Sequence, residues 1–437
     1  MNRFTLFLFF IATSLISHAQ LTSIEIKANQ FSSFLIEGQV DSAYAMFSKE
    51  VTAQMNKGQL RDLMPTIEGQ VGKLDHLDKV IQTEEGEYLV TYQPYHFKET
   101  LLDLKLVFNE EELISGMFFV PHKEFKIDLA NTDDFYETEI EVVTDKTYRL
   151  QGIITLPKQS EKCPAVVLVH GSGPNDMDET LGPNKLFKDL AHELAKNGIA
   201  VIRYEKRTRA YAGRPELDVA SLTLDEETID DALSAVDMIR KDKRIDKNKV
   251  YVLGHSIGGM AAPRIANRSK WVNGIIIMAG NARPFETLIK EQISYIFNQD
   301  STINAHEQAI LDQMEEQFTS LSELQANGKT EGQLPFGLST AYWTYLNEYQ
   351  QTQVAADLNK PILVLQGKRD YQVTVEDYKK WKSALNKHPE STFHLYEKLN
   401  HMMLEGEGLC YPAEYEIKAP LPTYVVNDIV NWIKSQN

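Results

Sequence analysis

The fold is decided by residues 249–260, which have the sequence KVYVLGHSIGGM. The apolar, β-branched run 249–253 predicts a buried strand, and the small residues after Gly258 predict the start of a helix. Gly254 and Gly258 flank Ser256 because a Cβ at either position would clash in so sharp a strand-to-helix turn. Such a turn lifts the serine hydroxyl above the sheet edge, so the stretch predicts an exposed nucleophile at Ser256.

Short apolar runs alternate with helical patterns on both sides of this turn. Strands are expected at 165–169, 200–204, 274–278, 361–365 and 392–396, helices at 186–197, 224–240 and 423–435, and a leading hairpin at 139–143 and 150–156. Thr223 is expected to cap the second of these helices. Uniformly apolar strands separated by helices indicate a mostly parallel sheet covered on both faces. The sequence therefore predicts an α/β domain over residues 135–437.

A serine nucleophile needs a base, normally histidine, oriented by a carboxylate. The expected chain order is serine, acid, histidine, with the last two at the ends of later strands. Asp370 follows the 361–365 strand and His401 follows the 392–396 strand, so these two residues are the candidates. Alternatives are Glu376 or Asp377 for the acid, and His388 or His394 for the base. His255, inside the turn, is expected to pack beneath it as a structural residue.

Acyl transfer also needs N–H donors for the developing oxyanion. The backbone N–H of Ile257, directly after the nucleophile, is one candidate. The second should lie in the glycine-rich loop 170–174, with Ser172 as first choice and Gly171 as second. A phosphate cradle is the competing interpretation of this loop, but no lysine stands at the required spacing.

The α/β pattern is interrupted over residues 281–359 by helical, Gln- and Glu-rich sequence. An insertion after a strand end lies over the catalytic edge of such a sheet, so we expect a lid that shapes the substrate pocket. Tyr342 and Trp343 are candidate pocket residues. The alternative is a solvated helical decoration away from the site.

Residues 1–19 have the features of a secretory signal peptide: a basic start, an apolar run over 6–16 and small residues before Gln20. The chain is therefore expected to be secreted or periplasmic, with no membrane association after cleavage. A retained anchor is the alternative. Residues 22–120 predict a small α+β domain, with helices over 24–47, strands at 87–92, 102–108 and 113–119, and no catalytic constellation. Residues 121–134 form the expected linker.

The formal net charge of −17 makes nucleic acid an unfavourable partner, because phosphate binding needs a basic face. No motif has metal-ligand spacing, so no metal is expected. The acids Asp176, Asp178 and Glu179 miss the EF-hand pattern and are expected to form a solvated loop. Only Cys163 and Cys410 could form a disulfide, and their pairing stays open.

The motifs at 170–176, 203–207, 254–258, 366–370 and 400–401 resemble those of secreted α/β-hydrolases. More narrowly, they are similar to EstD-like carboxylesterases, which carry an N-terminal DUF3887 domain of the nuclear-transport-factor-like type. The resemblance implies a Ser-Asp-His triad, no cofactor, and activity on small-molecule carboxylic esters with a short acyl chain. A homo-oligomer is a separate expectation. Serine aminopeptidases and acyl thioesterases share this fold, and an inactive acyl-binding protein is the alternative from another class.

Overall fold

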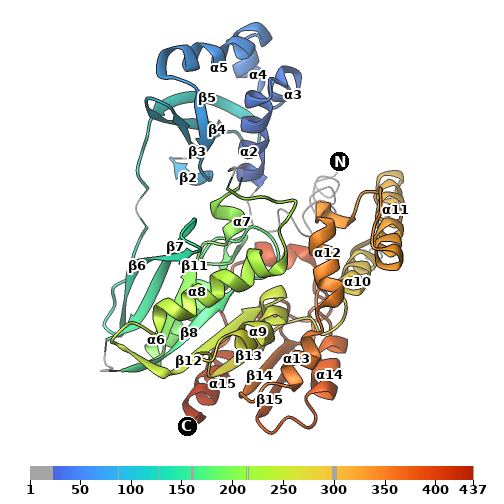
Figure 1. Cartoon of the computed structure of the whole chain (residues 1–437). Coiled ribbons are helices and arrows are strands. Elements are labelled where there is room, and N and C mark those ends of the chain that lie inside the picture. Colours follow the sequence, from blue (N-terminus) through green and yellow to red (C-terminus); the bar gives the residue numbers. More distant parts are fainter. Residues whose placement is uncertain are drawn as a thin grey trace. The chain divides into compact units, whose positions relative to one another are not determined.

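The computed structural model describes residues 23–86, 88–125, 127–158, 162–212, 214, 216–297 and 303–436 (Figure 1). It forms two compact units. One contains residues through Asp128 together with Thr208–Leu217, and the other contains 129–207 and 218–436. The chain thus divides within the segment 121–134. The segment Thr208–Leu217, which sequence analysis placed in the α/β domain, packs with the N-terminal unit instead.

An eight-stranded sheet forms the centre of the larger unit, in the order β15-β14-β13-β12-β8-β11-β7-β6. Its strands are β6 (Phe135–Thr144), β7 (Tyr148–Pro157), β8 (Cys163–Val169), β11 (Ala200–Tyr204), β12 (Ile245–His255), β13 (Gly274–Met278), β14 (Ile362–Gly367) and β15 (Ser391–Tyr396). The six strands from β15 to β11 are parallel, and β7 joins β11 antiparallel. The mostly parallel sheet and its leading hairpin are as predicted.

Helices cover both faces of this sheet. One face packs against α6 (Leu186–Lys196) and α15 (Thr423–Ser435), whose apolar residues share a buried cluster with alternate residues of the central strands. The other carries α8 (Asp230–Ile239), α9 (Ile257–Arg268), α13 (Gln351–Ala356) and α14 (Val375–Ala384). The short helix α7 (Arg207–Ala210) follows β11, and the small hairpin of β9 (Thr180–Leu181) and β10 (Asn184–Lys185) precedes α6.

The predicted helix 224–240 differs from expectation at its start. A π-helix, η1 (Asp225–Ile229), precedes α8, and the helical conformation begins at Leu224. Thr223 stands directly before it. The Thr223 hydroxyl contacts Glu226 and accepts a hydrogen bond from the Asp225 N–H at 3.2 Å, and the Glu226 carboxylate accepts the Thr223 N–H at 3.0 Å. Thr223 therefore caps the start of this helix, as predicted. Two acidic residues of this π-helix, Asp225 and Glu227, accept hydrogen bonds from tyrosines of a later helix, as described below.

The insertion 281–359 is helical. It contains α10 (Phe285–Phe297), α11 (Ala305–Asn327), the 3-10 turn η2 (Pro335–Gly337), α12 (Thr340–Glu348) and α13. Residues of α10, α11 and α12 form their own apolar cluster, which includes Ile293, Phe318, Leu321 and Trp343. The insertion is thus a small packed body rather than a set of separate solvated helices. We refer to it as the lid after its expected role.

The N-terminal unit packs four helices on one face of a five-stranded sheet. The helices are α2 (Ser23–Ile36), α3 (Val40–Ala45), α4 (Lys49–Thr52) and α5 (Lys57–Val71). The strands are β1 (Leu74–Leu77), β2 (Ile81–Glu85), β3 (Tyr88–Phe97), β4 (Leu101–Phe108) and β5 (Ile114–Pro121), with β3 between β4 on one side and β1 and β2 on the other. Leu104 and Leu106 face the helical core, as their alternation predicts.

Among the described residues, no helix is long and apolar enough to cross a membrane. The expected signal segment 1–19 lies outside those residues.

Cys163 and Cys410 are both buried and free, so the pairing left open by the sequence is not present in this structure.

Candidate active site

Ser256 lies at the sharp turn between β12 and α9, with φ 54° and ψ −120°. This left-handed conformation is costly for a residue with a side chain, and surrounding contacts hold it in place. A Cβ on Gly254 would lie 2.0 Å from the Gly258 carbonyl oxygen, and one on Gly258 would lie 2.2 Å from that of Val169. The turn therefore closes only with glycine at both positions, as its sequence predicts.

Asp370 and His401 meet at the ends of β14 and β15. The Nδ1 of His401 lies 2.8 Å from Asp370 Oδ2, and both side chains are buried. The other oxygen, Asp370 Oδ1, accepts the N–H groups of Gln372 and Val373 at 2.8 and 2.9 Å. Gln366 Nε2 donates to Oδ2 at 3.0 Å. The carboxylate is thus fixed from four directions with one oxygen aimed at the imidazole.

The loop that carries His401 is held by its neighbour Asn400, which is 1% exposed. Asn400 Oδ1 accepts the N–H groups of Met402 and Leu404 at 3.1 and 3.0 Å. His255, next to the nucleophile, places its Nε2 3.0 Å from the His401 carbonyl oxygen. One contact therefore joins the loop of the candidate nucleophile to that of the candidate base.

The alternative acids and bases lie in other environments. Asp377 pairs with Arg283 at 2.7 Å, and Glu376 pairs with Lys379 on the surface. The two other histidines are also engaged: His388 Nε2 lies 2.9 Å from the Leu358 carbonyl oxygen, and His394 pairs with Asp428 at 3.2 Å. Neither histidine is bonded to Asp370.

The loop 170–174 approaches Ser256 closely. A Cβ on Gly171 would lie 3.3 Å from the Cβ of Ser256, so a larger residue would crowd the nucleophile. The Gly171 N–H, however, already donates to Glu179 Oε1 at 2.7 Å. Gly171 is therefore wrong as an oxyanion donor. The N–H of Ser172 makes no hydrogen bond to a described residue, and the N–H of Ile257 is the first of α9, where a helix has no internal acceptor.

Glu179 is the main residue that the sequence analysis placed incorrectly. It is 0% exposed and pairs with His255 Nδ1 at 3.1 Å. Its acidic neighbour Asp178 pairs with the buried Arg203 at 2.8 Å. The acids at 176–179 therefore do not form a solvated loop, because buried cations compensate two of them.

Burial and mutual attraction act in opposite directions on the pKa values of Glu179 and His255. Burial opposes ionisation of both groups, but their mutual attraction and hydrogen bond raise the pKa of His255 and lower the pKa of Glu179. His170, also buried, has a lowered pKa because burial disfavours its charged form. His255 is thus held beneath the turn by the Glu179 carboxylate, in line with its expected packing role.

Lys206 is a further residue of the site that sequence reasoning missed. It is 2% exposed, and its Nζ donates to the Gly171 carbonyl oxygen at 2.8 Å. The same Nζ pairs with Glu227 of η1 at 2.7 Å. Glu227 in turn accepts a hydrogen bond from the hydroxyl of Tyr342 in α12. A buried polar chain therefore runs from the loop beside Ser256 to the lid.

Tyr342 and Trp343 do not line an open pocket as predicted. Tyr342 is 3% exposed and anchors α12 to Glu227, and Trp343 is 1% exposed within the apolar cluster of the lid. The Trp343 Nε1–H donates to the Pro335 carbonyl oxygen at 3.3 Å. Both residues are structural because their helix turns them toward the interior.

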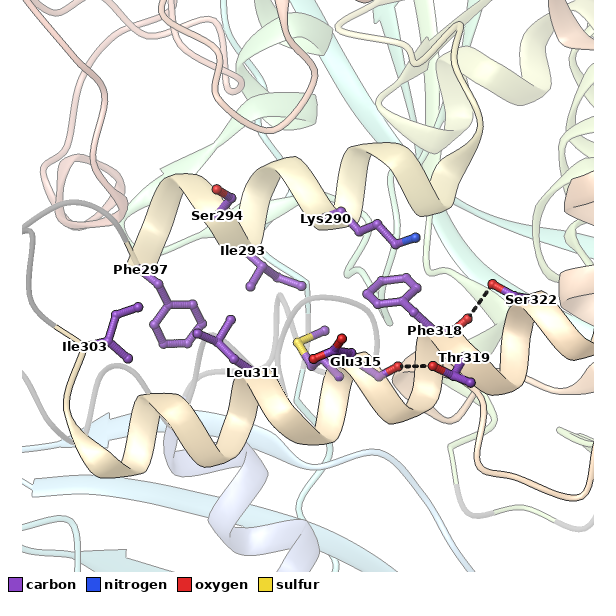
Figure 2. A pocket seen from close by; sticks show the side chains of 11 residues that line it. Lys290, Ile293, Ser294, Phe297, Ile303, Leu311, Glu315, Phe318, Thr319 and Ser322 are labelled. Atoms are coloured by element: carbon purple, nitrogen blue, oxygen red, sulfur yellow. Dashed lines mark hydrogen bonds between the residues drawn. The ribbon is translucent and has the colours of Figure 1, made fainter.

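A cavity of about 520 Å³ lies within the lid, between α10 and α11 (Figure 2). Phe297, Ile293, Leu311 and Phe318 give it an apolar lining, and Lys290 and Glu315 stand at its border. Its lining residues include none of the candidate catalytic residues, so the cavity belongs to the packing of the lid.

A strained serine at a strand-to-helix turn, beside a bonded histidine and carboxylate on later loops, defines the α/β-hydrolase class. The family described as serine aminopeptidase, S33, matches residues 160–407, and the DUF3887 family of unknown function matches residues 28–117. The chain is 35% identical over 399 residues to esterase EstD of Thermotoga maritima, covering 90% of this chain and 91% of that protein.

The chain therefore belongs to the S33 family of α/β-hydrolases and, within it, is an EstD-like ester hydrolase with an N-terminal DUF3887 domain. This confirms the resemblance inferred from the motifs. Among solved structures, an esterase of Pyrococcus furiosus is 14% identical, with 69% of this chain and 91% of that chain covered and a TM-score of 0.46. Est1E of Butyrivibrio proteoclasticus is 15% identical, with 68% and 99% covered and a TM-score of 0.45.

Proposed function

We propose that the chain hydrolyses short-chain carboxylic esters through an acyl-enzyme formed on Ser256. The observation that carries this proposal is the 2.8 Å contact between His401 and Asp370, on loops joined through His255 to the strained serine. His401 removes the hydroxyl proton of Ser256, whose oxygen attacks the ester carbonyl, and then returns a proton to the leaving alcohol. Asp370 orients the imidazole and stabilises its charged form.

The developing oxyanion is bound by the N–H groups of Ile257 and Ser172. Lys206 acts through its hydrogen bond to the Gly171 carbonyl oxygen and keeps the loop in position. Water activated by His401 then attacks the acyl-enzyme and releases the acid. Apart from the ester and this water molecule, each step uses only residues of the chain.

Labelling with a fluorophosphonate tests the nucleophile. We expect one labelled site per chain at Ser256, complete loss of labelling in Ser256→Ala, and loss of p-nitrophenyl acetate hydrolysis in the same variant. Ser172→Ala is the matched control, because it keeps the backbone N–H and should keep both labelling and activity. Folded protein that resists the probe while binding acyl ligands would identify an inactive binding protein instead.

Peptide cleavage is the second candidate, because the matching family is described as an aminopeptidase. An aminopeptidase needs an acid that is free to bind the substrate amino group. Two buried acids that contact residues of the candidate site, Glu179 and Glu227, are already paired with His255 and Lys206. This favours esters. Comparing p-nitrophenyl esters, acyl thioesters and aminoacyl-p-nitroanilides tests the assignment, and faster turnover of the anilides would overturn it.

We also propose that the chain is exported, on the sequence features of residues 1–19. Expression of the full chain in a Gram-negative host should give a periplasmic product that begins at Gln20. A cytoplasmic product with an intact Met1 would contradict export. A homo-oligomer is a further proposal, and light scattering of the purified protein tests it.

A further inference from the structure

Two histidines face each other across neighbouring strands of the N-terminal unit. His76 of β1 and His96 of β3 are register partners in the antiparallel pair, and their rings stack with centroids 4.1 Å apart. Asp78 follows His76 by two residues and lies directly after the end of β1. Asp78 Oδ2 lies 2.9 Å from His96 Nε2, and Oδ1 lies 4.0 Å from His76 Nε2.

We propose that His76, Asp78 and His96 form a binding site for one divalent transition-metal ion such as Zn²⁺. Each residue offers a ligand atom, and these atoms lie within 4.8 Å of one another. Ligands at the usual 2.0–2.1 Å from zinc lie about 3.4 Å apart. The separations must therefore shorten by at most about 1.4 Å, a change within the reach of rotation about the bonds of these partly exposed side chains.

A second carboxylate orients one of the proposed ligands. Asp75 Oδ2 lies 2.9 Å from Nδ1 of His76, which leaves Nε2 of the same ring directed toward Asp78. Histidines that bind metals commonly donate their other ring N–H to a carboxylate in this way. The contact distinguishes His76 from a surface histidine whose ring is unconstrained.

The ligand set defines the class of ion. Imidazole nitrogens suit Zn²⁺, Co²⁺ and Ni²⁺, whereas Mg²⁺ and Ca²⁺ prefer oxygen ligands only. His76, Asp78 and His96 are 25%, 27% and 31% exposed, so an ion can enter and complete its coordination with water. Three protein ligands with an open position are sufficient for zinc.

Arg214 competes for the same carboxylate. Its guanidinium pairs with Asp78 Oδ1 from the segment Thr208–Leu217, which belongs to the same unit. A divalent ion at Asp78 would repel this charge and must displace it. Removing the arginine charge should therefore strengthen metal binding at Asp78.

Titration calorimetry of the purified full chain with ZnCl₂ tests the site. We expect one Zn²⁺ per chain, affinity lowered at least tenfold in His76→Ala and in His96→Ala, and affinity raised in Arg214→Gln. His394→Ala is the matched control, because His394 pairs with a single carboxylate and no second histidine; it should bind as the parent does. Visible absorption of bound Co²⁺ should report nitrogen coordination and disappear in His96→Ala.

Excess Mg²⁺ should leave Zn²⁺ binding unchanged, which separates this site from ion attraction by the net charge of −17. Hydrolysis of p-nitrophenyl acetate by each variant verifies that the protein is folded. Binding that persists in the His76→Ala, His96→Ala double variant, or Zn²⁺ that is displaced by Mg²⁺, would overturn the proposal.

Discussion

The hydrogen bonds of individual residues around Ser256 indicate which peptide groups are structural and which are candidates for substrate binding. Gly171 uses its N–H for Glu179 and its carbonyl oxygen for Lys206, so it is fixed on both sides. The neighbouring Ser172 N–H has no such bond to a described residue. Because Gly171 is held on both sides, the direction of the adjacent Ser172 N–H is restricted as well. The proposed role of Ser172 in oxyanion stabilisation depends on this kind of preorganisation.

Asp370→Asn should lower kcat by about three to four orders of magnitude while the fold is kept. The amide oxygen of asparagine can still accept the Gln372 and Val373 N–H groups. Its amide nitrogen, however, favours the wrong imidazole tautomer of His401 and stabilises no positive charge. Rates on p-nitrophenyl acetate measure the loss. Glu376→Gln, an exposed neighbour, is the control and should keep full activity; a small effect of Asp370→Asn would exclude the proposed acid.

At the scale of elements, the π-helix η1 connects the lid to the rest of the larger unit. Two lid tyrosines of α12 donate to its acids: Tyr342 to Glu227, and Tyr345 to Asp225. These two acids of η1 are thus bonded to α12. The lid is therefore attached by one buried and one partly buried hydrogen bond to carboxylate groups.

Tyr342→Phe should lower the free energy of unfolding by about 1.5–3 kcal/mol, because it removes a buried hydrogen bond to a charged group without removing the ring. Urea denaturation followed by fluorescence measures this change. Tyr424→Phe is the matched control, since its hydroxyl bonds Glu405 at the surface and should matter by less than about 0.5 kcal/mol. Equal effects of the two variants would show that Tyr342 does not anchor the lid.

Most elements of the larger unit could be predicted because its buried strands are uniformly apolar. The N-terminal helix α5 was missed, although Asn56 and Gln59 form a capping box at its start. Gly58, Pro65 and Gly69 weaken the helical pattern of that segment, and tertiary packing of Leu60 and Met64 overrides this weakness. Propensity alone therefore understated a helix whose apolar face is held by the core.

At the scale of the whole molecule, a buried ionic group at the edge of the large sheet links folding to pH. Glu137 of β6 bonds Arg203 of β11 and His192 of α6, each at 2.9 Å. Burial opposes the charged form, but the His192 hydrogen bond and the Arg203 charge lower the pKa of Glu137 to about 2 from its usual 4.5. A lowered pKa means stability that is present above the unfolded value and lost as pH falls through the folded one.

Glu137→Gln should therefore reduce the free energy of unfolding by about 3 kcal/mol at pH 7, and this difference should shrink steadily from pH 4.5 toward pH 2. Denaturation curves across this range measure it. Glu139→Gln, an exposed residue of the same strand, should give no such dependence. A difference between Glu137→Gln and the parent that is constant with pH would contradict the assigned charge state.

The sequence could place Ser256, Asp370 and His401 because each follows a strand that its composition reveals. It could not place Glu179, Lys206 or Glu227, since their burial and pairing depend on contacts between distant loops. The position of His76 opposite His96 likewise depends on strand register, which no local sequence pattern specifies. Residues that follow a recognisable strand could therefore be predicted, whereas contacts between residues far apart in the sequence could not.

The segment Thr208–Leu217 leaves the α/β unit and packs with the DUF3887 domain before the chain returns at Asp218. The two domains are consequently interleaved in sequence. Consider a chimera in which another N-terminal domain is joined to this hydrolase at Asp128. Its segment Thr208–Leu217 would then lack the native N-terminal domain on which it packs. Any exchange of these domains between proteins must therefore transfer two separate stretches of chain together to keep the packing of the N-terminal unit intact.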